Sequence, residues 1–344
     1  MLDRIDTHIH ALPPAYVAAV MAAGGDPSGF ASPEWSFDGT IKSMNATDTS
    51  LAILSVSAPG ASIAGTGEAG RKLARSINTY LGEQTTGSQS DGRLGFFGAL
   101  PDWNDVEGAV AELDFLYRQQ KLCFGVTVFT SYGVKLLGHA SFKPIWKRLQ
   151  GYKALVFTHP TLFDVTPRFI ASNLPQPVVD YALATTRMAV DLVLGGTLHA
   201  CPDVDVVLSH AGGTLPFLAG RIGGTLKIPS VESAVAVSQE TAGVGFARFY
   251  YDTALSTSAA QLGGLLDSAD PLHVLFGSDF PYCTQDVVDG QIEIYDSFVA
   301  KDPRGSLVSP GALRRNSMTL LQKHCQAHEL DWEFKAAGRT KSKL

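Results

Sequence analysis

The chain has 344 residues, of which 45% are hydrophobic and only 17% are charged. This balance excludes an intrinsically disordered chain, and four cysteines are too few for a disulfide scaffold of this length. The 27 Lys and Arg side chains are outnumbered by 33 Asp and Glu, which gives a net charge of −6, so nucleic acid is not an expected partner.

Eight short, apolar and β-rich runs follow one another along the chain, separated by segments that can form helices. The predicted strands are residues 5–8, 51–55, 94–99, 124–129, 155–158, 204–209, 249–253 and 274–277. Several runs are continuously apolar, which is typical of strands buried on both faces in a parallel sheet. Helices are expected between them, for example over 105–120 and 178–194. This alternation predicts an α/β fold, a (β/α)₈ TIM barrel, rather than a doubly wound sheet.

The connection after the first predicted strand is unusually long and spans residues 11–45. It contains a predicted short helix over 14–21 and then a stretch rich in Gly, Pro and Ser that leads to Trp35. Long loops after barrel strands usually lie over the active site. We therefore expect one domain over 1–344, with 11–45 as an inserted active-site loop region and 335–344 as a flexible tail.

Side chains that can bind a metal stand at the ends of four predicted strands. His8 and His10, two residues apart at the end of the first strand, share one face of an extended segment. His159 follows the fifth run, His210 the sixth and Asp279 the eighth. Imidazole with one carboxylate is a usual ligand set for Zn²⁺, with Mn²⁺ or Fe²⁺ as alternatives. A single histidine at a strand end is commonly structural, but residues at four strand ends of one barrel predict a metal site.

These segments resemble the metal-dependent amidohydrolase superfamily, and within it the branch of non-oxidative decarboxylases similar to aminocarboxymuconate-semialdehyde decarboxylase. The most specific motifs are 6–10 (DTHIH), 158–160 (THP), 209–216 (SHAGGTLP) and 277–281 (GSDFP). The resemblance implies that His8, His10, His159 and Asp279 hold one divalent ion. Zn²⁺ is the expected metal, Mn²⁺ is the alternative, and no organic cofactor is expected. The resemblance also implies that His210 faces the substrate as a catalytic group rather than as a ligand.

The chemistry implied by this resemblance is decarboxylation of an aromatic acid with an ortho-hydroxyl group. Protonation of the ring at the carbon that bears the carboxylate lets CO₂ leave as aromaticity returns. The ion would chelate the phenolate oxygen and one carboxylate oxygen as a Lewis acid. Asp279 is the candidate acid that hands the proton to the ring, with the alternative that it is only a ligand. His210 would hydrogen-bond the substrate carboxylate or the developing charge.

Within this branch the chain is most similar to salicylate-type decarboxylases of fungal polyketide pathways. That similarity implies 6-methylsalicylate as substrate and m-cresol with CO₂ as products. Members acting on the semialdehyde dicarboxylate place an arginine at about position 40, where this chain has Thr40, so a monocarboxylate is favoured. The candidate substrate-binding residues are Trp35, Phe280 and Tyr282 as walls of an apolar pocket and Arg187 and Arg221 as partners of a carboxylate, with ordinary packing or ion pairing as the alternatives.

Two other functions are compatible with the same residues. The ion could activate a water molecule for hydrolysis of a lactone or an amide. Hydrolytic members with two metals usually bridge them with a carboxylated lysine on the fourth strand, and residues 124–129 contain no lysine, which favours a single ion. A catalytically inactive barrel that serves as a binding partner would hold no metal.

The expected assembly is a homodimer, because the resemblance implies that an arginine at the position of Arg221 can reach the site of the neighbouring subunit. No run approaches the ~20 apolar residues that cross a bilayer, and residues 1–6 lack the apolar core of a signal peptide. We therefore expect a cytoplasmic protein that does not bind membranes. Ser342-Lys343-Leu344 is a peroxisomal address if the source is eukaryotic, with a frayed polar tail as the alternative.

Overall fold

The computed structural model describes residues 4–162, 164–165, 168 and 170–327. Eight parallel strands form one sheet in chain order. They are β1 (Arg4–His10), β2 (Thr49–Ser55), β3 (Leu94–Ala99), β4 (Cys123–Phe129), β7 (Leu155–His159), β8 (Asp205–Leu208), β9 (Tyr250–Asp252) and β10 (Val274–Leu275). A parallel bridge between Asp6 and Phe276 joins the last strand back to β1. The predicted (β/α)₈ barrel is confirmed, and all eight strands lie where they were expected, with small differences at their ends.

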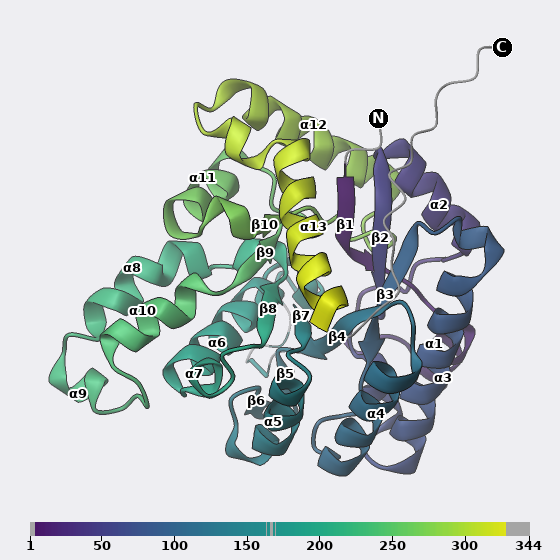
Figure 1. The fold of residues 1–344 in the computed structure, drawn as a ribbon, viewed down its shortest axis with the longest axis horizontal. Helices are drawn as coiled ribbons and strands as arrows, with labels where there is room; N and C mark the ends of the chain where they lie inside the picture. Colours follow the sequence, from purple (N-terminus) through teal and green to yellow (C-terminus); the bar gives the residue numbers. More distant parts are fainter. Residues whose placement is uncertain (1–3, 163, 166–167, 169, 328–344) are drawn as a thin grey trace.

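Helices follow the strands and cover the outside of the barrel (Figure 1). They are α1 (Pro14–Ala22), α2 (Phe37–Ala46), α3 (Glu68–Thr86), α4 (Val106–Gln119), α5 (Lys143–Gly151), α6 (Asp180–Leu194), α7 (Thr197–Ala200), α8 (Leu215–Thr225), α9 (Pro229–Glu232), α10 (Gln239–Ala247), α11 (Ala259–Ser268), α12 (Gln285–Lys301) and α13 (Pro310–Ala327). A small antiparallel hairpin, β5 (Ser131–Tyr132) with β6 (Lys135–Leu136), follows β4. The helix expected over 178–194 begins later, at Asp180, because Val179 has non-helical backbone angles.

The interior of the barrel is filled by apolar side chains and is closed at one end by α13. This cluster consists of Ile5, Leu51, Ile53, Phe97, Phe124, Leu155, Phe157, Val207 and Leu275 from the strands with Leu320, Leu321 and Cys325 from α13. Figure 1 shows α13 lying across the barrel. The Nε2 atom of His324, on α13, lies 2.9 Å from Oδ2 of Asp205 at the start of β8. Because α13 covers the amino-terminal ends of the strands, the opposite, carboxyl-terminal end is free to carry a functional site.

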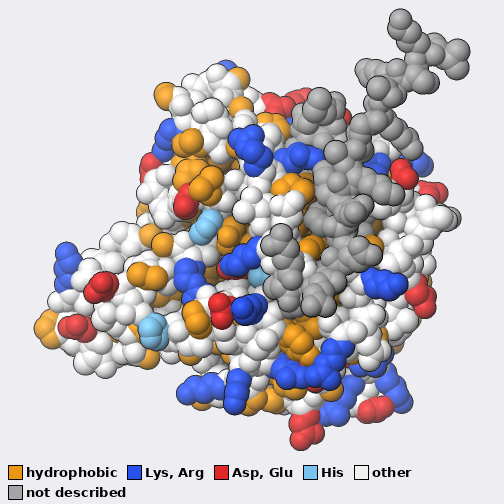
Figure 2. All heavy atoms as spheres, in the orientation of Figure 1, with side chains coloured by type: hydrophobic (Ala, Val, Ile, Leu, Met, Phe, Trp, Pro, Cys, Tyr) orange, Lys and Arg blue, Asp and Glu red, His pale blue; other side chains and the backbone are white. Residues whose placement is uncertain are grey.

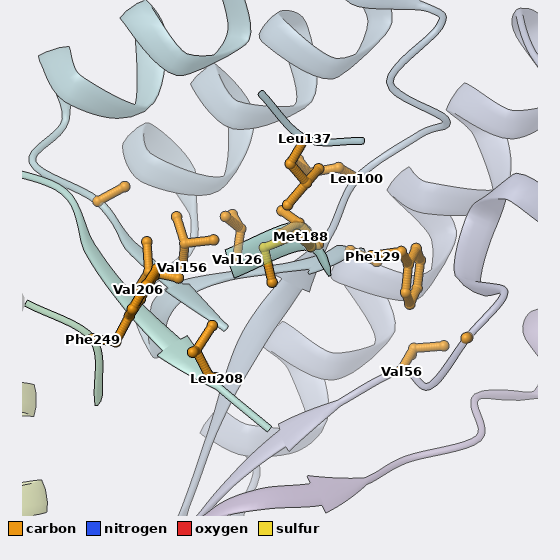
Figure 3. Close-up of a cluster of buried hydrophobic side chains, with 14 of the residues drawn as sticks. Val56, Leu100, Val126, Phe129, Leu137, Val156, Met188, Val206, Leu208 and Phe249 are labelled. Atoms are coloured by element: carbon orange, nitrogen blue, oxygen red, sulfur yellow. The ribbon is translucent and has the colours of Figure 1, made fainter. Parts of the chain in front are cut away.

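A second, larger core lies between the strands and the surrounding helices, and Figure 3 shows part of it. On β7, Leu155 and Phe157 belong to the interior cluster whereas Val156 packs in this outer core, which also contains Met188 of α6. Burial on both faces explains why several of the strand sequences are continuously apolar. The barrel is thus held between two apolar layers.

The surface in Figure 2 carries Lys and Arg side chains interspersed with Asp and Glu. None of the helices in the described part of the chain is both long and apolar enough to cross a membrane. The predicted flexible tail over 335–344, with Ser342-Lys343-Leu344, lies outside the described residues.

Candidate metal centre and substrate cavity

Four buried side chains meet at the carboxyl-terminal ends of the strands. His8 and His10 belong to β1, His159 ends β7, and Asp279 follows β10. One ligand atom from each lies within 4.8 Å of the others. The Nε2 atoms of His8 and His10 are 3.2 Å apart, and Oδ1 of Asp279 lies 3.4 Å from the first and 3.0 Å from the second. The structure thus brings together the four residues that the resemblance assigns to one ion.

Each of the three histidines is held through its Nδ1 atom, so that Nε2 is left for the shared point. Nδ1 of His8 lies 2.9 Å from Oδ2 of Asp252. Nδ1 of His10 lies 3.1 Å from Oγ of Ser55, and Nδ1 of His159 lies 2.7 Å from the carbonyl oxygen of Pro160. Such outer hydrogen bonds fix the orientation of metal-binding imidazoles. This buried set of three imidazole nitrogens and one carboxylate fits a divalent ion such as Zn²⁺ or Mn²⁺.

Burial and charge compete in setting the ionisation of the cluster. Burial lowers the pKa of His10 and lowers that of His159 well below its ordinary value. Burial alone would raise the pKa of Asp279, but the neighbouring imidazoles, with His8 first, hold it well below its usual range. Burial would also favour neutral His8, yet Asp252 and Asp279 on its two sides raise its pKa to about 10. The centre therefore presents an ionised carboxylate among imidazoles.

Two of the predicted site residues have left-handed backbone angles, with φ of +54° at His210 and +61° at Asp279. Such a conformation costs a non-glycine residue about 1–3 kcal/mol and persists where the surroundings enforce it. The amide of Asp279 donates to the carbonyl of His8 at 2.8 Å. Gly213 at φ +65° lets the loop after His210 pass α6, because a Cβ there would lie 2.1 Å from the carbonyl oxygen of Ala182. The SHAGGTLP and GSDFP motifs thus encode two strained turns that aim side chains into the site.

Asp252 is a candidate functional residue that was not predicted from the sequence. It ends β9 and is fully buried. Its Oδ2 atom faces Nδ1 of His8, and its Oδ1 atom accepts hydrogen bonds from the amides of His210 at 3.1 Å and Ala254 at 3.0 Å. One carboxylate therefore positions both a candidate ligand and the candidate catalytic histidine. Its place at the end of the seventh predicted strand was the signal that could have identified it.

A cavity of about 830 Å³ opens above the cluster, with His159, His210 and Asp279 at its base. Its walls are mostly apolar and include Tyr181 and Leu255. The segment between α1 and α2 contributes Asp26, Ser28 and Phe30. Among the described residues that line the cavity there is no lysine or arginine. A space of this size and character suits a small aromatic ligand.

Tyr282 is the predicted substrate-binding residue that the structure places in the cavity wall. Its ring lies 5.3 Å from the ring of His10, measured between centroids, at an angle of 88°. Trp35 does not line the cavity, because its Nε1 donates to Oγ1 of buried Thr40 at 3.0 Å and its ring packs edge-on against Phe37. Thr40 is likewise absent from the wall and offers no partner to a second substrate carboxylate.

The other three predicted substrate-binding residues also lie away from the cavity of their own chain. Phe280 is half-buried and packs against the outer core. Arg187 is exposed on α6, and Arg221 is exposed on α8. Roles for these residues in substrate binding therefore stay predictions, and a role for Arg221 requires a second copy of the chain.

The fold and the ligand set are those of a metal-binding barrel. The chain belongs to the amidohydrolase family, whose model matches residues 5–303. It is similar to decarboxylase macB of Penicillium terrestre, with 39% identity over 322 residues that cover 90% of this chain and 94% of the relative. It is similar also to the 6-methylsalicylic acid decarboxylase of Penicillium expansum, with 39% identity over 292 residues, 83% of this chain and 87% of the relative.

Solved structures share the architecture at lower identity. One is the dihydroxybenzoic acid decarboxylase from Polaromonas sp. JS666, which contains bound manganese and the inhibitor 2-nitroresorcinol. It superposes with a TM-score of 0.72 at 19% identity and covers 93% of this chain and 96% of that one. This likeness shows a common fold.

Proposed function

We propose that this chain is a metal-dependent decarboxylase of an ortho-hydroxybenzoate that converts 6-methylsalicylate to m-cresol and CO₂. The cavity carries this proposal: two of the four candidate ligands, His159 and Asp279, form its base with His210, its walls are mostly apolar, and no lysine or arginine is among its described lining residues. Such a space favours one aromatic ring whose single carboxylate lies at the cluster. The relative from Penicillium expansum, a 6-methylsalicylic acid decarboxylase by name, supports the same substrate.

His8, His10, His159 and Asp279 would hold one divalent ion, which we propose to be Zn²⁺, with Mn²⁺ as the alternative. When bound, the ion supplies a Lewis acid that withdraws negative charge from the oxygens of the substrate. All four side chains are buried, which supports a site that excludes water from the reacting atoms.

Asp279 is the group that would move the proton. Asp279 is ionised in the free site, so its carboxylate has an oxygen available to accept the hydroxyl proton of the incoming substrate. It then donates this proton to the ring carbon that bears the carboxylate. The carbon–carbon bond breaks, its electron pair restores the aromatic ring, and CO₂ leaves; the phenolate regains a proton from water. The Nε2 atom of His210 lies 3.4 Å from Oδ2 of Asp279. During this step His210 would hydrogen-bond the carboxylate of the substrate.

A substrate panel on metal-quantified enzyme tests the proposal. We expect 6-methylsalicylate to give m-cresol and CO₂, and in D₂O to give m-cresol with one deuterium at the vacated ring carbon. A chelator should abolish the reaction, and added Zn²⁺ or Mn²⁺ should restore it. Turnover of lactones or amides with inert hydroxybenzoates would refute decarboxylation in favour of hydrolysis. Purified protein that binds no metal would refute both the decarboxylase and the hydrolase function.

The proposed assembly is a homodimer that covers the mouth of the cavity. Phe217 lines the cavity, yet 89% of it is exposed, and Arg221 lies one turn further along α8. Exposed Val178 and Leu255 extend the same apolar rim. Apolar patches beside a cavity are typical of interaction surfaces. A second copy that packs on this rim would bury Phe217 and bring Arg221 toward the neighbouring cavity.

The variant Phe217→Glu tests this assembly, because a charge in an apolar interface is costly to bury. We expect light scattering to report a dimer for the native chain and a monomer for the variant. Val134→Glu is the matched control, since Val134 is also 89% exposed but lies on the turn between β5 and β6. A native monomer, or a dimer that survives Phe217→Glu, would show that the rim is not the interface.

A further inference from the structure

Asp26 places a second carboxylate in the cavity, away from the ligand cluster. It belongs to the segment between α1 and α2, and its side chain lines the same cavity as Asp279. Oδ1 of Asp26 accepts a hydrogen bond from the amide of Ser28 at 2.7 Å. No lysine, arginine or histidine of the described chain forms an ion pair with it. Arg168 donates from Nη2 to the carbonyl of the next residue, Pro27, at 2.5 Å, and does not line the cavity. The carboxylate of Asp26 therefore faces the cavity without an ion pair in the described part of the chain.

Tyr282 lies close both to the metal centre and to the segment that carries Asp26. Its ring is 5.3 Å from that of His10 on one side and 6.1 Å from that of Phe30, on the same segment as Asp26, on the other. Burial raises the pKa of Tyr282 and that of Tyr181, a second tyrosine of the cavity wall, and the charge of Asp26 raises both further. The charge of Asp26 thus acts on the aromatic wall that a bound ring would contact.

A second anionic group on the substrate would share the cavity with this charge. Burial raises the pKa of Asp26, which reflects how poorly the surroundings solvate its negative charge. Like charges brought together in such a site cost binding free energy, and the described residues of the wall offer no lysine or arginine to offset the cost.

We propose that Asp26 is a specificity-determining residue that excludes substrates with a second carboxylate, so that the cavity selects monocarboxylic hydroxybenzoates. This inference rests on the proposed function and deepens it, because it names a residue that defines the substrate class. The metal cluster receives the one carboxylate that reacts, and Asp26 rejects a carboxylate at the far edge of the ring.

The variant Asp26→Asn tests the charge alone, since its amide oxygen can still accept the hydrogen bond from Ser28. The probes are salicylate, 4-hydroxyisophthalate and 2-hydroxyterephthalate; the last two carry a second carboxylate para to the hydroxyl or para to the first carboxylate. We expect the ratio of kcat/KM for the dicarboxylates to that for salicylate to rise by about tenfold or more. Asp26→Ser, which also removes the charge, should act in the same direction.

Asp38→Asn is the matched control, because Asp38 is exposed in the first turn of α2 and does not line the cavity. It should leave the ratio unchanged. The inference is overturned if both Asp26 variants leave the ratio unchanged or lower all three activities equally. Calorimetric titration of the same probes into metal-loaded protein gives the corresponding ratio of binding constants, which does not depend on turnover. A native chain that binds salicylate but decarboxylates neither salicylate nor 6-methylsalicylate would refute the proposed function, while the ratio of binding constants still decides the role of Asp26.

Discussion

Asp279→Asn, at full metal occupancy, is expected to lower kcat for 6-methylsalicylate by about 10²–10⁴-fold, the range that a positioned acid–base group contributes. The amide keeps an oxygen that can face an ion, but it cannot take a proton from the substrate hydroxyl and pass it to the ring. The measurement is kcat under saturating metal and substrate, together with elemental analysis of the metal bound per chain.

His210→Ala is the companion variant, because His210 hydrogen-bonds Asp279 without belonging to the ligand cluster. It should retain the metal and lose activity through weaker substrate binding and a slower chemical step. If the Asp279→Asn enzyme holds a full complement of metal and keeps kcat within a few-fold of the native value, Asp279 is a ligand only, and the proton must come from another group.

Asp252→Asn should weaken metal binding by about 10- to 100-fold, the usual effect of losing an outer partner of a metal-binding histidine. The native carboxylate faces Nδ1 of His8 and accepts from the amide of His210. An asparagine presents one acceptor and one donor, so it cannot serve both neighbours. The measurement is metal affinity by competition with a chelator, followed by activity at saturating metal.

Excess metal should restore only part of the activity of Asp252→Asn, because the one acceptor that remains cannot orient both His8 and the backbone of His210. Asp205→Asn is the matched control, since Asp205 is another buried aspartate at a strand end and contacts His324 at the opposite end of the barrel. It should lower the melting temperature without changing metal affinity. Complete rescue of Asp252→Asn by metal would limit Asp252 to the positioning of His8.

The barrel could be predicted from the sequence because its strands are buried on both faces. Apolar or nearly apolar runs such as residues 94–99 and 124–129 identify such strands without knowledge of their neighbours. The candidate metal cluster could also be predicted from the sequence, because a (β/α)₈ barrel brings the carboxyl ends of all its strands to one mouth. His8 and Asp279 could therefore be expected to meet although 271 positions separate them in the chain.

The walls of the cavity could not be predicted in the same way, because they depend on the direction of side chains in loops. Phe280 and Tyr282 follow a left-handed residue, and that turn directs Tyr282 into the cavity and leaves Phe280 in the outer core. Trp35 pairs with Thr40, and no pattern in the sequence indicates this contact. Asp26 stands in a loop without periodicity, so only the folded chain reveals that it faces the substrate space.

The closure of the barrel has a consequence for how the protein matures. The last strand, β10, is only two residues long, and a bridge between Asp6 and Phe276 joins it to the first. The candidate ligands lie on both sides of this seam, with His8 and His10 on one and Asp279 on the other. During synthesis the ribosome must therefore release almost the entire barrel before a complete ligand set exists. Metal loading then belongs to the end of biogenesis, and a truncated chain that lacks β10 has no complete site to load.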